Sequence, residues 1–361
     1  MAGIYIHIPF CKQACHYCNF HFSTSLRYKG DMIEAIKKEI KLQSNYLNNE
    51  TVETVYFGGG TPSLLEIDDI SSIFEALHQY HDISPTAEIT LEANPDDLTI
   101  SKINEFKSTP INRFSIGIQS FHEVDLKYMN RAHNATEAIT CIQNSQNAGF
   151  ENITIDLIYG TPTMNNTQWE ANIQQAFDLN IPHISCYALT VEPNTALDYF
   201  IKKGKSTAVN EEQSAQQFEI LVREITKAGY LHYEISNFAK PGFFAQHNSN
   251  YWKGQLYLGL GSSAHSFNKK TRQWNVANNM KYIEGLKNNQ LPFEVETLSP
   301  TDQYNEYIMT GLRTIWGVDL MKIKLFGNIY EEHFLKVVAP FIKEKLIIRK
   351  GRQFVLSQKA K

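Results

Sequence analysis

Six apolar runs that alternate with amphipathic segments constrain the fold of this 361-residue chain more than any other feature. The segments between the runs carry helical periodicity, and several end in Gly or Asn. Strands that are apolar throughout and separated by helices indicate a parallel sheet covered by helices. We therefore predict an α/β fold of six βα units, either a (βα)6 partial barrel or a doubly wound sheet, with its chemistry at the carboxyl ends of the strands. The six runs are residues 3–8, 54–60, 88–93, 113–118, 153–160 and 183–189.

The last part of the chain predicts a smaller second domain. Residues 211–230 have the pattern of one long helix, and a Pro-bounded change of composition follows at 291–300. Beyond it lie two helical segments and a hairpin centred on Lys350 and Gly351, as in a winged-helix module. No basic face argues for nucleic-acid binding, so we expect a packing or lid domain. The predicted units are a core over residues 1–235, a linking segment over 236–290 and a small α+β domain over 291–361.

Three of the five cysteines fall in the loop after the first predicted strand, in "CKQACHYC". Cys11, Cys15 and Cys18 are spaced C-x3-C-x2-C, and three thiolates can bind zinc, bind an iron–sulfur cluster or bind nothing. A structural zinc site normally has four ligands, so a histidine would have to complete it. A cubane [4Fe–4S] cluster held by three cysteines instead leaves one iron open to a chelating small molecule. The histidines that could complete a zinc site are His7, His16 and His21.

Composition excludes several classes of protein. With 42% hydrophobic residues, 20% charged residues and a net charge of -4, the chain is neither a disordered segment nor a polybasic nucleic-acid binder. The start "MAGIYIHIPF" lacks the pattern of a secretory leader, and no run approaches the ~18 apolar residues of a membrane span. An odd number of mostly bunched cysteines argues against a disulfide framework, and Cys141 and Cys186 have the pattern of ordinary buried thiols. We expect a cytoplasmic protein.

Glycines and polar residues also stand where predicted strands end. The stretch "YFGGGTPS" ends the second strand, and its glycines allow the backbone to approach a ligand closely, although a tight turn needs them equally. Glu92 and Asp156 are unfavourable in apolar strands unless they pair with another side chain or meet a ligand. Structural pairing inside the barrel is the alternative for both. Gln119 and Arg131 stand at later strand ends, and Arg131 fits a surface position equally well.

The cysteine pattern resembles that of the radical S-adenosylmethionine (radical SAM) superfamily, whose partial-barrel fold matches the six βα units. The resemblance implies a [4Fe–4S] cluster bound by Cys11, Cys15 and Cys18. It also implies that the amine and carboxylate of S-adenosylmethionine chelate the fourth iron. In the superfamily an electron from the reduced cluster then cleaves the sulfonium to a 5′-deoxyadenosyl radical. The cofactor carries the difficult chemistry and the protein orients it.

A narrower resemblance covers nearly the whole chain. The stretches "YIHIPFC", "FGGGTPS", "LEANPD", "GIQSF", "MNRAH", "DLIYGTP" and "CYALTVEP" are similar, in order and spacing, to oxygen-independent coproporphyrinogen III oxidases and their relatives, the HemW heme chaperones. The resemblance implies a set of contacts to S-adenosylmethionine at the strand ends. These contacts are Tyr5, Gly59, Gly60, Thr61, Glu92, Gln119, Arg131, Asp156 and Ala188.

Two features separate the oxidases from the chaperones. The oxidases carry a further cysteine two residues after the last cluster ligand, where this chain has Phe20, and an extension before the first strand, which here begins at Gly3. The stretch "QHNSNYW" matches the H-N-x-x-Y-W motif of the HemW group, which is associated with heme binding. His247 can ligate heme iron, and the aromatic residues after it offer flat apolar surface, although a histidine beside aromatics is more often a packed side chain.

The sequence therefore favours a heme chaperone that binds heme and transfers it to an acceptor protein, and that carries a [4Fe–4S] cluster and S-adenosylmethionine. The alternative is oxidative decarboxylation of coproporphyrinogen III. The implied partners are heme, an apo-hemoprotein acceptor and an electron donor such as a flavodoxin or ferredoxin. Transient contact with membrane hemoproteins and a dimer stay open.

Overall fold

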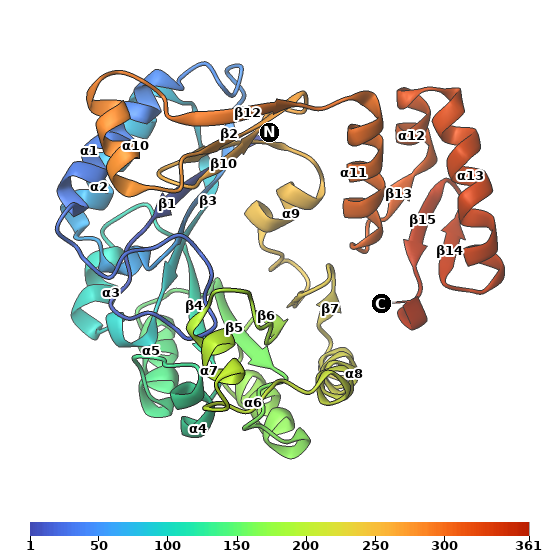
Figure 1. Cartoon of the computed structure of the whole chain (residues 1–361), viewed down its shortest axis with the longest axis horizontal. Coiled ribbons are helices and arrows are strands. Elements are labelled where there is room, and N and C mark those ends of the chain that lie inside the picture. The colour runs from blue at the N-terminus through green and yellow to red at the C-terminus, as the bar shows by residue number, and fades with distance from the viewer. Residues whose placement is uncertain (361) are drawn as a thin grey trace.

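The computed structural model describes residues 1–360. One twelve-stranded sheet dominates it, and six parallel strands in sequence order form its centre (Figure 1). This part confirms the predicted α/β partial barrel of six βα units. Its apolar strand residues are buried, as the unbroken apolar runs indicate. The six strands are β1 (Ala2–Ile8), β2 (Val52–Gly59), β3 (Ile83–Ala93), β4 (Arg113–Gln119), β5 (Ile153–Tyr159) and β6 (His183–Ala188).

Helices cover the outer face of these strands. Capping boxes begin two of them, where Asn134 pairs with Glu137 and Asn165 pairs with Gln168, so the backbone groups of the first turn are satisfied locally. The helices are α1 (Lys29–Leu42), α2 (Ile67–Tyr80), α3 (Ile100–Phe106), α4 (Glu123–Tyr128), α5 (Ala135–Asn147), α6 (Asn166–Asp178), α7 (Ala196–Lys202) and α8 (Glu211–Lys227). Short 3-10 helices are η1 (Pro62–Leu64), η2 (Pro95–Asp97) and η3 (Gln358–Ala360).

Residues 236–290, which we expected to form a linking segment, instead extend the large sheet. β9 pairs in parallel with β1, so the segment continues the barrel on the side opposite to β6. The added strands are short and mix polar with apolar residues, so they carry no regular period. The extension reaches beyond 236–290 at both ends, and its elements are β7 (Leu231–His232), β8 (Asn237–Ala239), α9 (Gln246–Trp252), β9 (Leu256–Leu260), β10 (His265–Phe267), β11 (Thr271–Asn275), α10 (Asn279–Lys287) and β12 (Phe293–Thr297).

The C-terminal residues fold as the predicted small α+β domain, to one side of the barrel (Figure 1). Its three strands follow the order β13-β15-β14, and a separate core around Val318, Phe334 and Phe354 holds them against the helices. The elements are α11 (Pro300–Leu312), β13 (Val318–Asp319), α12 (Leu320–Phe326), α13 (Asn328–Lys343), β14 (Ile347–Lys350) and β15 (Gln353–Leu356).

None of the helices within residues 1–360 combines the length and the apolar character that a membrane crossing requires.

Candidate functional site

A cavity of about 520 Å³ opens at the carboxyl ends of the parallel strands. The fold therefore places a hollow where the chemistry of a βα protein is expected. The structure brings together there eleven of the thirteen residues predicted from sequence. They are Cys11, Cys15, Cys18, Gly59, Gly60, Thr61, Glu92, Gln119, Arg131, Asp156 and Ala188.

Hydrogen bonds to backbone carbonyl groups hold the cysteine loop at this cavity. The amide of Cys11 donates to the carbonyl of Ser23 at 3.0 Å, and the side-chain amide of Asn130 donates to the carbonyl of Ala14 at 2.8 Å. All three cysteines are free thiols and partly exposed. Burial raises the pKa of the Cys11 thiol to about 11, so in the absence of a bound cation this thiol is protonated at neutral pH.

Arg131 is not a surface residue, because its guanidinium lies inside the cavity wall. One terminal nitrogen donates to Cys15 Sγ at 3.2 Å, and the other donates to the side chain of Asn94 and the carbonyl of Gly117, both at 2.7 Å. Its Nε is buried and has no hydrogen-bond partner among residues 1–360. A fixed positive charge therefore stands beside the thiols, with one donor left over for a further acceptor.

The glycine turn after β2 is fastened to the start of the cysteine loop. The Gly60 amide donates to the carbonyl of Ile8 at 2.9 Å, and the Thr61 amide donates to the carbonyl of Phe10 at 2.7 Å. Gly59 has φ +104°, which favours glycine, and its amide donates to Glu92. Since all three amides have acceptors in the protein, a ligand would meet this turn through its Cα surface and carbonyl groups.

Two carboxyl groups, those of Glu92 and Asp156, line the same cavity. Glu92 accepts from the Tyr56 hydroxyl at 2.8 Å and from the Gly59 amide at 3.1 Å. Burial raises the pKa of Glu92 to about 7 and the pKa of Asp156 to about 6, and the Asp156 charge further raises that of Glu92. Both carboxyls are therefore poised to gain a positively charged partner, which would lower these pKa values.

The three histidines that could complete a zinc site contact other groups. His7 contacts the Tyr5 hydroxyl and the carbonyl of His21, His16 contacts the carbonyl of Tyr128, and His21 contacts Asn279. Within residues 1–360 no group of three or more His, Cys, Asp or Glu side chains is arranged to hold a single metal ion.

The motif "QHNSNYW" folds as a single helix, α9, and His247 lines neither cavity. Its side chain is 2% exposed. Nδ1 lies 2.8 Å from Thr54 Oγ1 and Nε2 lies 2.8 Å from the Tyr251 hydroxyl, while the ring stacks on Tyr56. Burial lowers the pKa of His247 to about 3, so the ring is neutral. Its role as a heme ligand stays a prediction, and in this structure both ring nitrogens already have partners.

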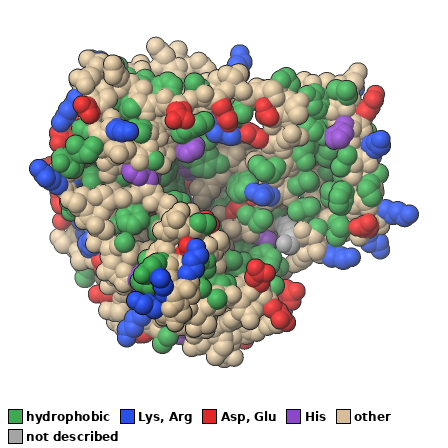
Figure 2. All heavy atoms as spheres, in the orientation of Figure 1, with side chains coloured by type: hydrophobic (Ala, Val, Ile, Leu, Met, Phe, Trp, Pro, Cys, Tyr) green, Lys and Arg blue, Asp and Glu red, His purple; other side chains and the backbone are tan. Residues whose placement is uncertain are grey.

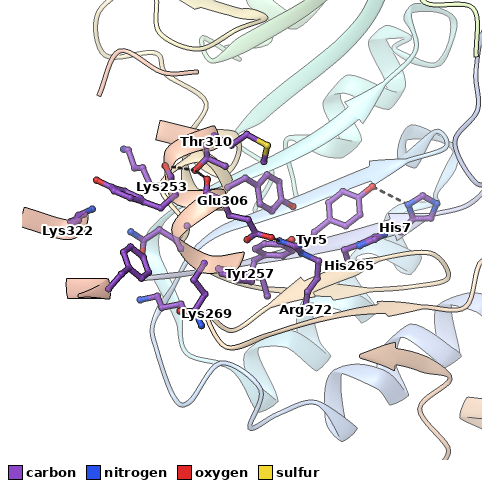
Figure 3. A pocket seen from close by; sticks show the side chains of 18 of the residues that line it. Tyr5, His7, Lys253, Tyr257, His265, Lys269, Arg272, Glu306, Thr310 and Lys322 are labelled. Atoms are coloured by element: carbon purple, nitrogen blue, oxygen red, sulfur yellow. Dashed lines mark hydrogen bonds and ion pairs between the residues drawn. The ribbon is translucent and has the colours of Figure 1, made fainter. Parts of the chain in front are cut away.

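A second, larger cavity of about 1050 Å³ lies between the barrel and the C-terminal domain. Figure 2 shows the hollow near the centre of this face, with histidine and basic side chains at its rim. Tyr5, predicted as a cofactor contact, lines this cavity rather than the first, and its hydroxyl lies 3.1 Å from His7 (Figure 3). Phe20 lines both cavities and is 69% exposed.

Sequence reasoning missed most of the larger cavity. Its lining combines β1 and the cysteine loop with α9 to β11 and with α11 and α12, which are three separate stretches of the chain. The Gly- and aromatic-rich character of residues 241–267 was the available signal, but it does not say which side chains share a wall. In the smaller cavity Tyr17, Asn94 and Tyr187 were also missed, although Asn94 follows a predicted strand directly and Tyr187 stands near the end of another.

Comparison with known proteins gives consistent matches. Residues 5–176 match the radical SAM superfamily, and residues 298–361 match the HemN C-terminal domain. The heme chaperone HemW of Lactococcus lactis is 31% identical over 98% of this chain and 93% of its own length. That of Bacillus subtilis is 31% identical over 96% and 93%, and that of Synechocystis is 35% identical over 93% and 84%.

The fold comparison agrees. The structure of coproporphyrinogen III oxidase (HemN) from Escherichia coli superposes with a TM-score of 0.86 at 21% identity, over 99% of this chain and 87% of that one. This likeness shows a shared fold, whereas the sequence identity to the chaperones extends over both domains. The chain is therefore a member of the HemW heme chaperone family within the radical SAM superfamily.

Proposed function

We propose that this protein is a heme chaperone that binds heme and transfers it to an acceptor hemoprotein. The observation that carries the proposal is the 31–35% identity to heme chaperones over more than nine-tenths of the chain. The cytoplasm is the proposed location, and an apo-hemoprotein and a flavodoxin- or ferredoxin-like electron donor are the proposed partners.

The smaller cavity is the proposed site of a [4Fe–4S] cluster and S-adenosylmethionine. Cys11, Cys15 and Cys18 would hold the cluster, which when bound would offer an iron open to chelation by an amino acid and would supply an electron. Three features of this cavity suit a [4Fe–4S] cluster with S-adenosylmethionine. The thiols share one cavity, the Arg131 charge lies beside Cys15, and the unused Nε of Arg131 offers a donor to a carboxylate.

The remaining predicted contacts fit the same cofactor. Glu92 and Asp156 present carboxyl oxygens that suit the ammonium group of S-adenosylmethionine. Gly59, Gly60 and Thr61 allow its methionyl chain to approach the turn, and the other predicted contacts border the same space. Those are Gln119 and Ala188, whereas Tyr5 lines the larger cavity and stacks on Tyr56 of β2.

Phe20 argues against the oxidase alternative at one position. A cysteine at this place accompanies the oxidases, and here an exposed aromatic ring stands between the two cavities. Turnover of coproporphyrinogen III therefore serves as an outcome of the test and not as a second proposal.

The test is an anaerobic heme titration of the cluster-reconstituted protein and of a His247→Ala variant, followed by visible absorbance. We expect a saturable Soret band near one heme per chain that is weakened in the variant. The same preparations are then assayed for decarboxylation of coproporphyrinogen III. Absence of specific heme binding together with turnover would replace the chaperone by the oxidase.

A further inference from the structure

The larger cavity has the size and the walls of a site for a flat apolar ligand. Its volume of about 1050 Å³ is at the upper end of the roughly 300–1,000 Å³ typical of small-molecule sites. An aromatic wall runs along it, in which Tyr251 meets Tyr257 at 4.6 Å between ring centroids and Tyr257 meets Phe267 at 6.1 Å. Phe20 extends apolar surface to the boundary with the smaller cavity. Such walls suit an extended ring system.

The charges of the lining suit a ligand that carries carboxylates. Four basic side chains line the cavity, against one carboxyl group, Glu306, which pairs with Arg272 at 2.7 Å. In Figure 3, Lys253, Lys269 and Lys322 lie on one side of the view, and Tyr5 and His265 lie on the other side. A ligand with an apolar body and anionic arms therefore matches both ends. The basic residues are Lys253, Lys269, Arg272 and Lys322.

Three histidines line this cavity, and they differ in what their ring nitrogens contact. Both nitrogens of His7 have partners, in Tyr5 and the carbonyl of His21, and His7 is 5% exposed. His21 has Nε2 bonded to Asn279. His265, in β10, is exposed, and its ring stacks on Trp274 at 6.1 Å with 28° between planes. Over residues 1–360 neither of its ring nitrogens takes part in a hydrogen bond, so this imidazole is available to a metal.

We infer that the larger cavity holds the tetrapyrrole and that His265 coordinates its iron, with Lys253, Lys269 and Lys322 near the propionates. This inference rests on the proposed function, because it names the place and the ligand of the heme that the chaperone carries. The apolar body and the carboxylate arms are common to heme and to iron-free porphyrins, whereas the imidazole of His265 selects the iron.

The same geometry gives the motif in α9 a positioning role. His247 lies behind Tyr251, and its Nε2 holds the Tyr251 hydroxyl, so the histidine fixes one ring of the aromatic wall from outside the cavity. Coordination of iron by His247 would require Thr54 or Tyr251 to give up its hydrogen bond. Loss of His247 should therefore free the Tyr251 ring and weaken porphyrin binding. It should not change which imidazole binds iron.

The experiment compares heme and metal-free protoporphyrin IX in titrations of the full-length, cluster-reconstituted protein. His265→Ala should weaken heme binding about tenfold or more and shift the Soret band, and added imidazole should restore the band position. Its affinity for metal-free protoporphyrin should stay within about twofold of wild type, because no iron is present to bind. His78→Ala, an exposed histidine on α2 that lines neither cavity, is the matched control and should change nothing.

One further pair of variants and one single variant test the other parts of the inference. Lys269→Ala should weaken both porphyrins, whereas the adjacent Lys270→Ala, outside the lining, should weaken neither. His247→Ala should weaken both porphyrins and leave the Soret position and the low-temperature spin resonance of the bound heme unchanged.

The outcomes are distinguishable. If His265→Ala behaves like His78→Ala while the wild type binds heme, the assignment of His265 is wrong and the chaperone proposal stands. If His247→Ala alone shifts the heme spectrum, the iron is held in α9 and the inference is overturned. If the wild type binds no heme, the proposed function itself fails.

Discussion

At the scale of single residues, the informative positions are polar groups placed where an apolar sheet would otherwise continue. Glu92 lies at the carboxyl end of β3 and Arg131 lies in the loop after α4, and each uses only part of its hydrogen-bonding capacity. A buried charge without a full set of partners is unfavourable in an empty site and becomes favourable when a ligand of opposite charge arrives. Arg131 and Glu92 therefore suit the carboxylate and the ammonium group of the proposed S-adenosylmethionine.

Substitution of Glu92 by Gln should weaken S-adenosylmethionine binding roughly 10- to 100-fold, because a charge-assisted hydrogen bond of about 1.5–3 kcal/mol is lost. The pKa of Glu92, raised to about 7 by burial, sets the pH dependence. The carboxylate form binds an ammonium group, so wild-type affinity should rise between about pH 6 and about pH 8. Isothermal titration of the reconstituted protein measures both effects.

The control for this experiment is Glu75→Gln, an exposed position on α2. It should keep both the affinity and the pH dependence of the wild type. A Glu92→Gln protein that binds S-adenosylmethionine as tightly as wild type would show that the ammonium group lies elsewhere.

At the scale of elements, tertiary contacts join helices to strands that carry weak local signals. Glu39 of α1 is 0% exposed and accepts from the Gly261 amide at 2.9 Å, from Asn275 at 2.7 Å and from the Tyr282 hydroxyl. One carboxyl group thus fastens α1 to the end of β9, to β11 and to α10. These contacts support the extension of the sheet beyond β1, in addition to the pairing of β9 with β1.

Tyr282→Phe should lower the free energy of unfolding by about 1.5–3 kcal/mol, because it removes a buried hydroxyl that bonds a carboxyl group. Chemical unfolding followed by circular dichroism measures the change. Tyr199→Phe, at a 53% exposed tyrosine in α7, should change stability by less than about 0.5 kcal/mol. Equal effects of the two substitutions would mean that the Glu39 cluster does not stabilise the sheet extension.

The helix α9 contains the motif "QHNSNYW", and the helical geometry decides where the motif side chains lie. His247 and Tyr251 are four residues apart, so one face of the helix presents both, and the 2.8 Å contact between them follows from that spacing. The heme-binding role predicted from the motif stays a prediction, and the helix directs its histidine inward against β2.

At the scale of the whole molecule, two folding units enclose the larger cavity. Trp316, just after α11, packs near Tyr233 and Phe244 of the barrel side, and Lys253 lies 4.2 Å from its ring centroid. The pair of Arg272 and Glu306 joins β11 to α11 at the cavity edge. The position of the C-terminal domain therefore determines the width of the cavity.

Trp316→Ala should loosen this docking, because aromatic and cation–π contacts of about 0.5–2 kcal/mol each are lost. We expect faster hydrogen exchange in α11 and about a tenfold or smaller loss of heme affinity, with S-adenosylmethionine binding unchanged, since the smaller cavity lies within the barrel. Phe341→Ala, at a 43% exposed residue of α13, is the control. Unchanged exchange in the Trp316 variant would show that the domain is held by other contacts.

The sequence by itself determined the features that repeat locally. These features can be recognised from the sequence without knowledge of the fold. They are the six βα units, the α11 and α13 helices with the hairpin after them, and the spacing of the three cysteines. The tertiary structure decided the rest. It made residues 236–290 part of the sheet, turned His247 inward and set His265 in a cavity with Phe20 and Lys322. The physical reason is that local patterns report which face of an element is apolar, whereas a cavity wall is made by side chains from elements that meet only after the chain has folded.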